Sequence, residues 1–488
     1  MPTVPSDPST DRPDAPLAPA APLAPAAPLR GADAPLDALR VRLDGRLALP
    51  DEPGYAAAQP WNVAIPVRPA AVVAARCPRD VAEAVRFAGE HGLRVAVQRT
   101  GHGALPLDAD DVLLVHTGAL TDLQVDPVGR TARVGAGCVW QQVIEAAAPH
   151  GLVPLCGSAP GVGVAGFLTG GGIGPLVRSQ GLSADRVRAI EVVTGEGRIL
   201  RATAEQHSDL FWGLRGGKGT LGIVTAVELE LLPLREVHGG AVYFDGADAE
   251  AVVRTWARWA PSLPEHADTS IALLQLPPLP AVPEPLAGRP TVAVRFASVA
   301  GDDAAAALLE ELRAVATPLI DAVGPLPTSA LGAIHADPVD PMPVHEGHAL
   351  LRALPDDAVD ALLAAAGPAA GSPQVIVELR LLGGALARAP RHASAFCQRD
   401  AAFSLCTIGV LAPPVAEAVP AHATALAAAL EPWSTGGRLP NFAPSPDPAV
   451  NDRCYDAPTR AHLATLAAQH DPRGVLAVGQ VVRSGAPA

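Results

Sequence analysis

Lysine is nearly absent from this sequence, and aromatic residues are scarce. Lys218 is the only lysine, and the 488 residues include only three tyrosines. Acidic residues outnumber basic ones by 50 to 36, and no basic patch is interleaved with aromatic side chains. Nucleic acid is therefore not expected as a partner, because its phosphates are bound by concentrated positive charge.

Long apolar runs are missing too. The apolar share is 49% and the mean hydropathy is +0.23. Segments such as residues 71–75 are nevertheless far shorter than the roughly 20 apolar residues of a membrane-spanning helix. The first residues contain acids and prolines where a secretory signal has a basic start and an apolar stretch. We expect a soluble, cytoplasmic protein with no membrane partner.

Several common site motifs are also absent. No Cys-x-x-Cys pair occurs, so zinc and redox-dithiol chemistry are disfavoured. The cysteines are expected to be buried thiols in a reducing compartment. They are Cys77, Cys138, Cys156, Cys397, Cys406 and Cys454. The lysine is followed by Gly219 and not by Ser or Thr, so there is no Walker sequence. Gly161-x-Gly163-x-x-Gly166 matches the dinucleotide-binding fingerprint by letter, but more glycine follows it where that fingerprint has a long helix. A nicotinamide-dependent reductase is therefore disfavoured.

The chain length predicts more than one domain. Residues 1–45 contain a repeated Ala-Pro-Leu phrase and are predicted to be a disordered arm. The character of the sequence changes after Pro233, which indicates a second domain.

Apolar periodicity predicts mixed helices and strands. Predicted strands are 71–75, 93–98, 112–115, 189–193, 198–202, 291–296, 375–382 and 475–482. Predicted helices are 80–90, 139–148, 304–315, 359–366 and 459–470. Asp80 and Glu83 predict a capping box for the first helix, and Gly92 predicts its end. Hairpin turns are predicted at 126–129 and 195–197.

The densest glycine stretch of the chain indicates a binding loop. Its members are Gly157, Gly161, Gly163, Gly166, Gly170, Gly171, Gly172 and Gly174. Glycine lets backbone N–H groups approach an anion or a flat ring without an intervening side chain. A second glycine-rich segment follows at residues 213–222. Two such loops favour a phosphate-bearing cofactor, although loops that only turn tightly are an alternative.

Three ordered segments resemble one known family. They are VQRTGHG (97–103), GVGVAGFLTGGGIG (161–174) and the run from Phe211 to Thr225. Together they resemble the berberine-bridge-enzyme-like branch of the vanillyl-alcohol oxidase flavoproteins, over residues 61–234 and the last forty or so. The resemblance implies an α+β fold: a two-part PCMH-type FAD-binding domain (46–236) plus a substrate-binding domain (237–437) whose antiparallel sheet is covered by helices. It also implies a C-terminal segment (438–488) that returns to the first domain. It also implies FAD bonded through its 8α carbon to His102.

The resemblance implies a set of cofactor contacts. They are Arg99, Thr100, Gly101, His102, Gly103, Val162, Gly163, Gly166, Gly170, Gly171, Gly174, Gly222, Ile223, Val224 and Asn441.

The sequence departs from the family at three positions. Many members have a second flavin tether, a cysteine, where this chain has Ala159, and Cys156 lies three residues too early. A histidine of many members is Phe167 here, and the usual catalytic tyrosine is Leu439, two residues before Asn441. A single linkage through His102 is therefore expected, and the catalytic base is unknown.

Other candidates for the chemistry are few. Glu378 and Arg380 share one face of a predicted strand, where they either form a surface salt bridge or contact substrate. Tyr455 is either a catalyst or a packing residue. No metal site is expected from the poorly spaced group His335, Asp337, Asp340, His345 and His348.

The function implied is FAD-dependent oxidation of a small organic substrate such as an alcohol, a sugar or a natural-product intermediate. The resemblance implies hydride transfer to flavin N5. It also implies O₂ as electron acceptor, because a small residue near the flavin C4a edge tends to permit oxygen access in this family and Val162 is compatible with that. One alternative is a natural-product tailoring enzyme that closes a ring or desaturates a bond. Another, suggested by the missing tyrosine, is a redox-inactive flavin-binding homologue.

Overall fold

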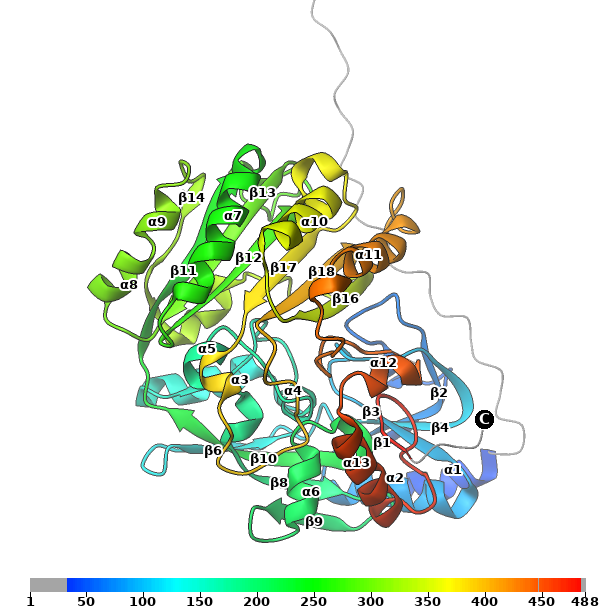
Figure 1. The fold of residues 1–488 in the computed structure, drawn as a ribbon. Helices are drawn as coiled ribbons and strands as arrows, with labels where there is room; N and C mark the ends of the chain where they lie inside the picture. Colours follow the sequence, from blue (N-terminus) through cyan, green and yellow to red (C-terminus); the bar gives the residue numbers. More distant parts are fainter. Residues whose placement is uncertain (1–32, 446, 484–488) are drawn as a thin grey trace, which may run out of the picture.

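The computed structural model describes residues 33–445 and 447–483, which form three sheets with helices around them (Figure 1). Most of the predicted disordered arm lies outside the described residues. Its last part was predicted wrongly, because α1 (Asp33–Arg40) is a helix. Leu36 and Leu39 of α1 are buried in the core beneath the first sheet, which fixes this helix in place.

The first sheet has four strands in the order β1-β2-β4-β3. Their bounds are β1 (Arg46–Ala48), β2 (Val67–Ala74), β3 (Arg94–Gln98) and β4 (Leu107–His116). Strands β2, β4 and β3 are parallel, and β1 is antiparallel to β2. Helix α2 (Pro78–His91) connects β2 to β3 and buries its apolar face against this sheet.

The ends of α2 test the capping prediction. Gly92 ends the helix in the left-handed conformation (φ 70°), as predicted. The capping box is wrong, because the helix begins earlier, after Cys77. The Asp80 carboxylate instead accepts hydrogen bonds from the backbone N–H groups of Arg76, Asp44 and Gly45.

The second sheet is antiparallel, with the order β5-β6-β10-β8-β9 and β7 paired to β10. Its strands are β5 (Leu123–Asp126), β6 (Thr131–Gly135), β7 (Val153–Pro154), β8 (Val187–Val193), β9 (Ile199–Thr203) and β10 (Ile223–Leu232). Both predicted hairpins are confirmed, as β5–β6 and β8–β9. Its helices are α3 (Trp140–Ala147), α4 (Val164–Thr169), α5 (Val177–Gln180) and α6 (Ser208–Leu214).

The third sheet is antiparallel, with the order β14-β11-β13-β12-β17-β18-β16 and β15 paired to β11. Its strands are β11 (Glu236–Asp245), β12 (Ala267–Gln275), β13 (Pro290–Ser298), β14 (Ile320–Asp321), β15 (Gly324–Pro327), β16 (Val344–Leu351), β17 (Ile376–Leu381) and β18 (Phe403–Val410). Its helices are α7 (Ala249–Trp259), α8 (Asp302–Leu308), α9 (Glu310–Arg313), α10 (Asp356–Ala366) and α11 (Ala418–Ala429).

The two faces of the third sheet differ. Helices α7, α10 and α11 share one apolar core with one face (Figure 1). The opposite face carries polar side chains, and Arg380 reaches from it to Ser158 of the glycine-rich segment. This polar face is therefore turned towards the first two sheets.

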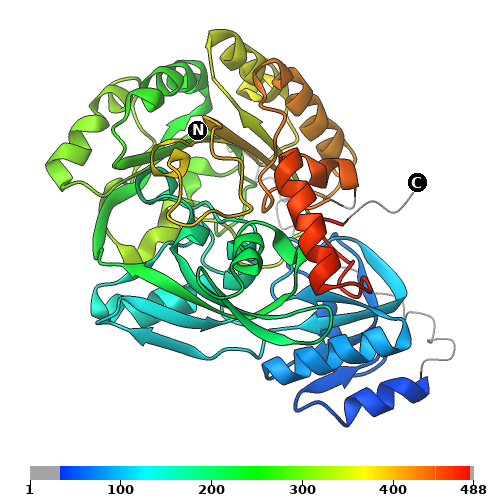
Figure 2. The same cartoon turned by 60° about the horizontal axis from the view of Figure 1, so that its bottom comes forward.

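The C-terminal segment packs back onto the N-terminal half through α12 (Pro448–Asp452) and α13 (Ala457–His470) (Figure 2). The predicted helix at 459–470 is confirmed, but the predicted strand at 475–482 is wrong. The Asp471 carboxylate accepts hydrogen bonds from the backbone N–H groups of Val475 and Leu476. Gly474 and Gly479 both have positive φ, which breaks an extended course. Within the described ranges, no helix has the length and apolar content to cross a bilayer.

Candidate functional site

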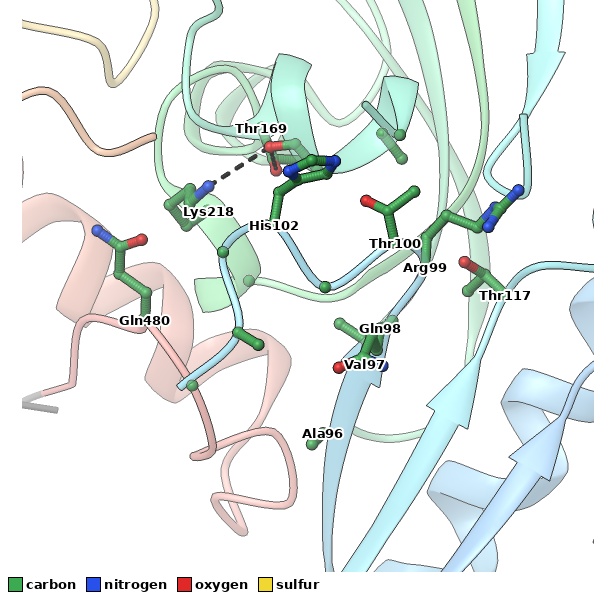
Figure 3. A pocket seen from close by; sticks show the side chains of 18 of the residues that line it. Ala96, Val97, Gln98, Arg99, Thr100, His102, Thr117, Thr169, Lys218 and Gln480 are labelled. Atoms are coloured by element: carbon green, nitrogen blue, oxygen red, sulfur yellow. Dashed lines mark hydrogen bonds between the residues drawn. The ribbon is translucent and has the colours of Figure 1, made fainter. Parts of the chain in front are cut away.

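A cavity of about 270 Å³ lies where three separated segments meet (Figure 3). The loop after β3 forms one wall, the turn into α4 forms the second, and the loop before β10 forms the third. Residues 478–480 of the C-terminal segment also line it. Two sheets and the chain terminus thus contribute to one site.

The geometry of the His102 loop depends on one glycine. Gly101 has φ 77°, and a Cβ there would lie 2.5 Å from Cα of Pro60. Only glycine combines this conformation with this close approach. The backbone N–H of Trp61 donates to the carbonyl of Thr100 at 2.8 Å, and the Trp61 ring stacks on the His102 ring with centroids 4.6 Å apart. The imidazole is therefore held in a defined orientation.

His102 is half-buried, and burial lowers its pKa to about 4, while the nearby Asp337 carboxylate opposes that shift. The imidazole is therefore neutral at neutral pH and keeps a ring nitrogen lone pair. A lone pair is what bond formation to an electrophilic carbon requires.

The glycines around the cavity fit a flat, phosphate-bearing group. A Cβ on Gly103 or Gly166 would meet no neighbouring atom, so these positions leave open space along the wall. Arg99 lines the cavity and donates from Nε to the carbonyl of Gly137 at 2.5 Å. These residues fit FAD, because they offer open backbone for the flavin and phosphates, a cation and a neutral histidine.

Most of the predicted cofactor contacts lie on this cavity. They are Arg99, Thr100, Gly101, His102, Gly103, Val162, Gly163, Gly166, Gly222, Val224 and Asn441. Gly170, Gly171, Gly174 and Ile223 do not line it. A Cβ on Gly171 would strike the Phe396 ring, and one on Gly174 would strike the carbonyl of Cys156. These glycines allow close packing, and Ile223 belongs to the core of the first sheet.

The sequence reasoning missed several residues of the cavity, among them Thr117, Thr169, Lys218 and Gln480. Lys218 carried a signal, as the only lysine in the middle of a glycine-rich loop. Gln480 and the two residues before it carried none, because they reach the cavity only through the long-range return of the C-terminal segment.

A buried ionic cluster joins the third sheet to the glycine-rich segment. Oε1 of Glu378 lies 3.1 Å from Nη1 of Arg295 and 3.2 Å from Nε2 of His335. Arg380 donates to Glu378 at 3.5 Å and to the Ser158 hydroxyl at 3.0 Å. The two arginines outweigh burial and hold the pKa of Glu378 well below its ordinary value. This carboxylate is charged at neutral pH and is a poor proton acceptor.

A second group of polar residues lies on the same face, on β16 and β18. In the sheet register His348 is opposite Cys406, and Cys406 is opposite Glu378. Glu346, two residues before His348, shares their face. Solvent reaches Glu346, yet surrounding protein and the Asp337 carboxylate raise its pKa to about 7. The Asp337 carboxylate acts electrostatically on both Glu346 and His102, so it lies near both groups.

Two histidines of the group for which no metal site was expected have separate hydrogen-bond partners. His335 is bonded to Glu378 and Arg380, and His348 lies 3.2 Å from the Ser404 hydroxyl. Among the described residues, Asp44, Cys77 and Asp80 do lie close together. The Asp80 oxygens already accept three backbone hydrogen bonds, and Arg79 pairs with Asp44. This group is accounted for without an ion.

Three residues singled out from the sequence lie off the cavity. The Tyr455 hydroxyl donates to the carbonyl of Gly216 at 3.0 Å within a buried core. Leu439 is 2% exposed and packs with apolar residues such as Phe396. Cys156 is buried, which raises its pKa to about 12 and leaves a thiol where a thiolate is needed for a flavin bond.

Comparison with known proteins agrees with this geometry. Residues 69–203 match the family described as FAD binding domain. The chain is 29% identical over 240 residues to (R)-6-hydroxynicotine oxidase of Paenarthrobacter nicotinovorans, covering 49% of each protein. It is 39% identical over 179 residues to the FAD-linked oxidoreductase easE of Arthroderma benhamiae, covering 34% of this chain and 36% of that protein. The chain thus spans about half or less of the length of these curated relatives.

Solved structures show the same fold over nearly the whole chain. Physcomitrella patens BBE-like 1 has a TM-score of 0.79 at 19% identity, covering 92% of this chain and 100% of that one. The 6-hydroxy-D-nicotine oxidase of Arthrobacter nicotinovorans has a TM-score of 0.76 at 23% identity, covering 89% and 96%.

Residues 69–203 thus match an FAD-binding domain, and the chain has the PCMH-type fold of these solved structures. The resemblance seen in the sequence is confirmed for the FAD-binding domain and for the fold.

Proposed function

We propose that the protein is an oxidase that carries FAD attached through His102 and oxidises a small organic substrate: an alcohol, a sugar or a natural-product intermediate. The observation that carries this proposal is the convergence of three separated segments on one cavity with a neutral imidazole at its wall. When bound, FAD supplies a hydride acceptor at N5 and passes the electrons to O₂, giving H₂O₂. The name of one similar protein, (R)-6-hydroxynicotine oxidase, supports this reaction class.

The substrate is proposed to bind between the cofactor cavity and the polar face of the third sheet. Trp61 and Asp337 border this space beside His102. The Arg380–Ser158 hydrogen bond ties the sheet to the glycine-rich segment and keeps the two walls in register. The Glu378 cluster is proposed to position these walls and to take no part in proton transfer.

Glu346 is proposed to accept the substrate proton. It shares its face with His348, whose ring stacks on Phe442 next to the cavity residue Asn441. A carboxylate whose pKa is about 7 exists in both protonation states near neutral pH, which suits a general base. A base on β16 also accounts for catalysis without the tyrosine that Leu439 replaces.

Anaerobic titration of the purified protein with a panel of alcohols, sugars and amines tests the proposal. We expect at least one donor to bleach the visible flavin absorbance, and readmitted O₂ to restore it with about one H₂O₂ per donor oxidised, the yield expected of an oxidase. A protein that stays yellow with every donor would be a redox-inactive flavin binder. Bleaching that only an artificial acceptor reverses would contradict the oxidase assignment.

A further inference from the structure

Lys218 is held in an unusual backbone conformation beside the cofactor cavity. Its φ is 54°, in the left-handed region that favours glycine, and both of its neighbours are glycines. It joins the short helical turn Lys218–Thr220 that leads into β10. A strained non-glycine residue at such a place points to a function of its side chain.

The Lys218 ammonium has only neutral partners within hydrogen-bonding distance. Nζ donates to Oδ1 of Asn441 at 2.6 Å and to the carbonyl of Gly166 at 3.4 Å. Among the described residues, no carboxylate forms an ion pair with it. Surrounding protein lowers its pKa to about 8, with only the Cys454 thiol opposing this shift electrostatically. A cation in such surroundings is normally balanced by an opposite charge.

The open side of Lys218 faces the cofactor cavity. Lys218 is half-buried, and its accessible part lines the cavity together with His102 and Thr169. Figure 3 shows His102 and Lys218 directed towards the segment that contains Thr169, while Arg99 and Thr117 lie on the other side of the loop. The missing negative charge is therefore expected from the cofactor.

We propose that Lys218 sets the electron affinity of the bound flavin by compensating the negative charge that reduction places on it. A hydride brings two electrons and one proton, so its arrival adds one negative charge to a neutral ring system. In the proposed reaction the substrate loses a second proton to the protein, and the ammonium of Lys218 stays protonated and unconsumed. Asn441 acts as a positioning residue that holds Nζ at the cavity wall.

Sulfite binding and the reduction potential measure this role without any substrate. Sulfite adds to oxidised flavin with the same gain of negative charge, so its dissociation constant reports the local field. We compare FAD-loaded wild type, Lys218→Met and Lys218→Arg. Lys218→Met is expected to weaken sulfite binding by at least about tenfold, as loss of a nearby charge in a partly screened site implies. The reduction potential of the flavin in Lys218→Met is expected to fall. Both the sulfite affinity and the reduction potential of Lys218→Arg are expected to stay close to those of wild type.

A second variant separates charge from shape. Asn441→Asp leaves the lysine in place but puts a carboxylate oxygen beside Nζ, which neutralises its field. Asn441→Asp is expected to weaken sulfite binding, as Lys218→Met does. If Lys218→Met does not fold, Asn441→Asp alone tests the proposal. Unchanged sulfite affinity and potential in the folded variants would overturn the proposal. A second outcome would also overturn it: Lys218→Met loses part of its FAD, but the protein that keeps FAD binds sulfite normally. In that case the lysine charge would bind the diphosphate of FAD and would not act on the flavin ring. Failure of the proposed oxidase reaction would leave these readouts intact.

Discussion

Replacing Glu378 by glutamine is expected to destabilise the unit built on the third sheet by about 3 to 5 kcal/mol, the range for breaking a buried ion pair. The side chains of Arg295 and Arg380 are 5% and 9% exposed, and that of Glu378 is 12% exposed. Glutamine keeps the shape but removes the negative charge between the two guanidinium groups. Two buried like charges then remain without compensation.

Hydrogen exchange on peptides from β18 measures this free energy, because β18 pairs directly with the strand that carries Glu378. The matched control is Asp360→Asn, which breaks an ion pair between α10 and α7 on the same sheet. The side chain of Arg254 in this pair is 28% exposed and that of Asp360 is 58% exposed. This control is expected to change stability by no more than about 1 kcal/mol. If Glu378→Gln changed the opening free energy as little as the control does, the reasoning about this cluster would be refuted.

The effect of Glu378 also has a definite pH dependence. Its folded-state pKa lies below the ordinary value of 4.5, because the two arginines favour the charged form. The stabilisation is therefore fully present above that value and is lost as the pH falls through the folded-state pKa. The difference between wild type and Glu378→Gln should shrink as the pH falls below about 4.5.

Three further predictions concern the chemistry. In Glu346→Gln, the rate of anaerobic flavin reduction should fall by roughly 10²-fold or more, as removal of a general base implies. The increase of this rate with pH around pH 7 should also disappear. If the rate of the variant still increased around pH 7, the base would be another residue. Cys156→Ala should keep its full FAD content in absorbance spectra, because the thiol is buried off the cavity; a colourless variant would contradict this. Leu439→Tyr should lower stability in urea unfolding by about 1 to 3 kcal/mol through overpacking, without raising the reduction rate. A faster Leu439→Tyr enzyme would show that position 439 faces the substrate.

The parts of the fold that were predictable have local causes. Apolar periodicity identified α2, α13 and both hairpins, because each buries one face and ends at a turn residue such as Gly92. The predicted strand at 475–482 failed for a non-local reason. A β-prone run is held in irregular form by the Asp471 carboxylate and by packing on the N-terminal half, neither of which local propensity contains.

The candidate site was predictable to a similar extent. Glycine spacing and the resemblance singled out His102 and ten other residues that line the cavity. They could not separate glycines that line the cavity from glycines that only allow tight packing, such as Gly171 against Phe396. Lys218, Gln480 and Glu346 were missed because their roles depend on tertiary neighbours that are far away in the sequence.

The proposed chemistry depends on FAD being attached to the His102 imidazole in a cavity made by three separated segments. Mass spectrometry of peptides from the purified protein, with His102→Ala as the comparison, tests this attachment. We expect an FAD-sized adduct on the peptide that contains His102, no adduct on the peptide that contains Cys156, and none anywhere in His102→Ala. An unmodified His102 peptide from yellow protein, or an adduct on Cys156, would contradict it.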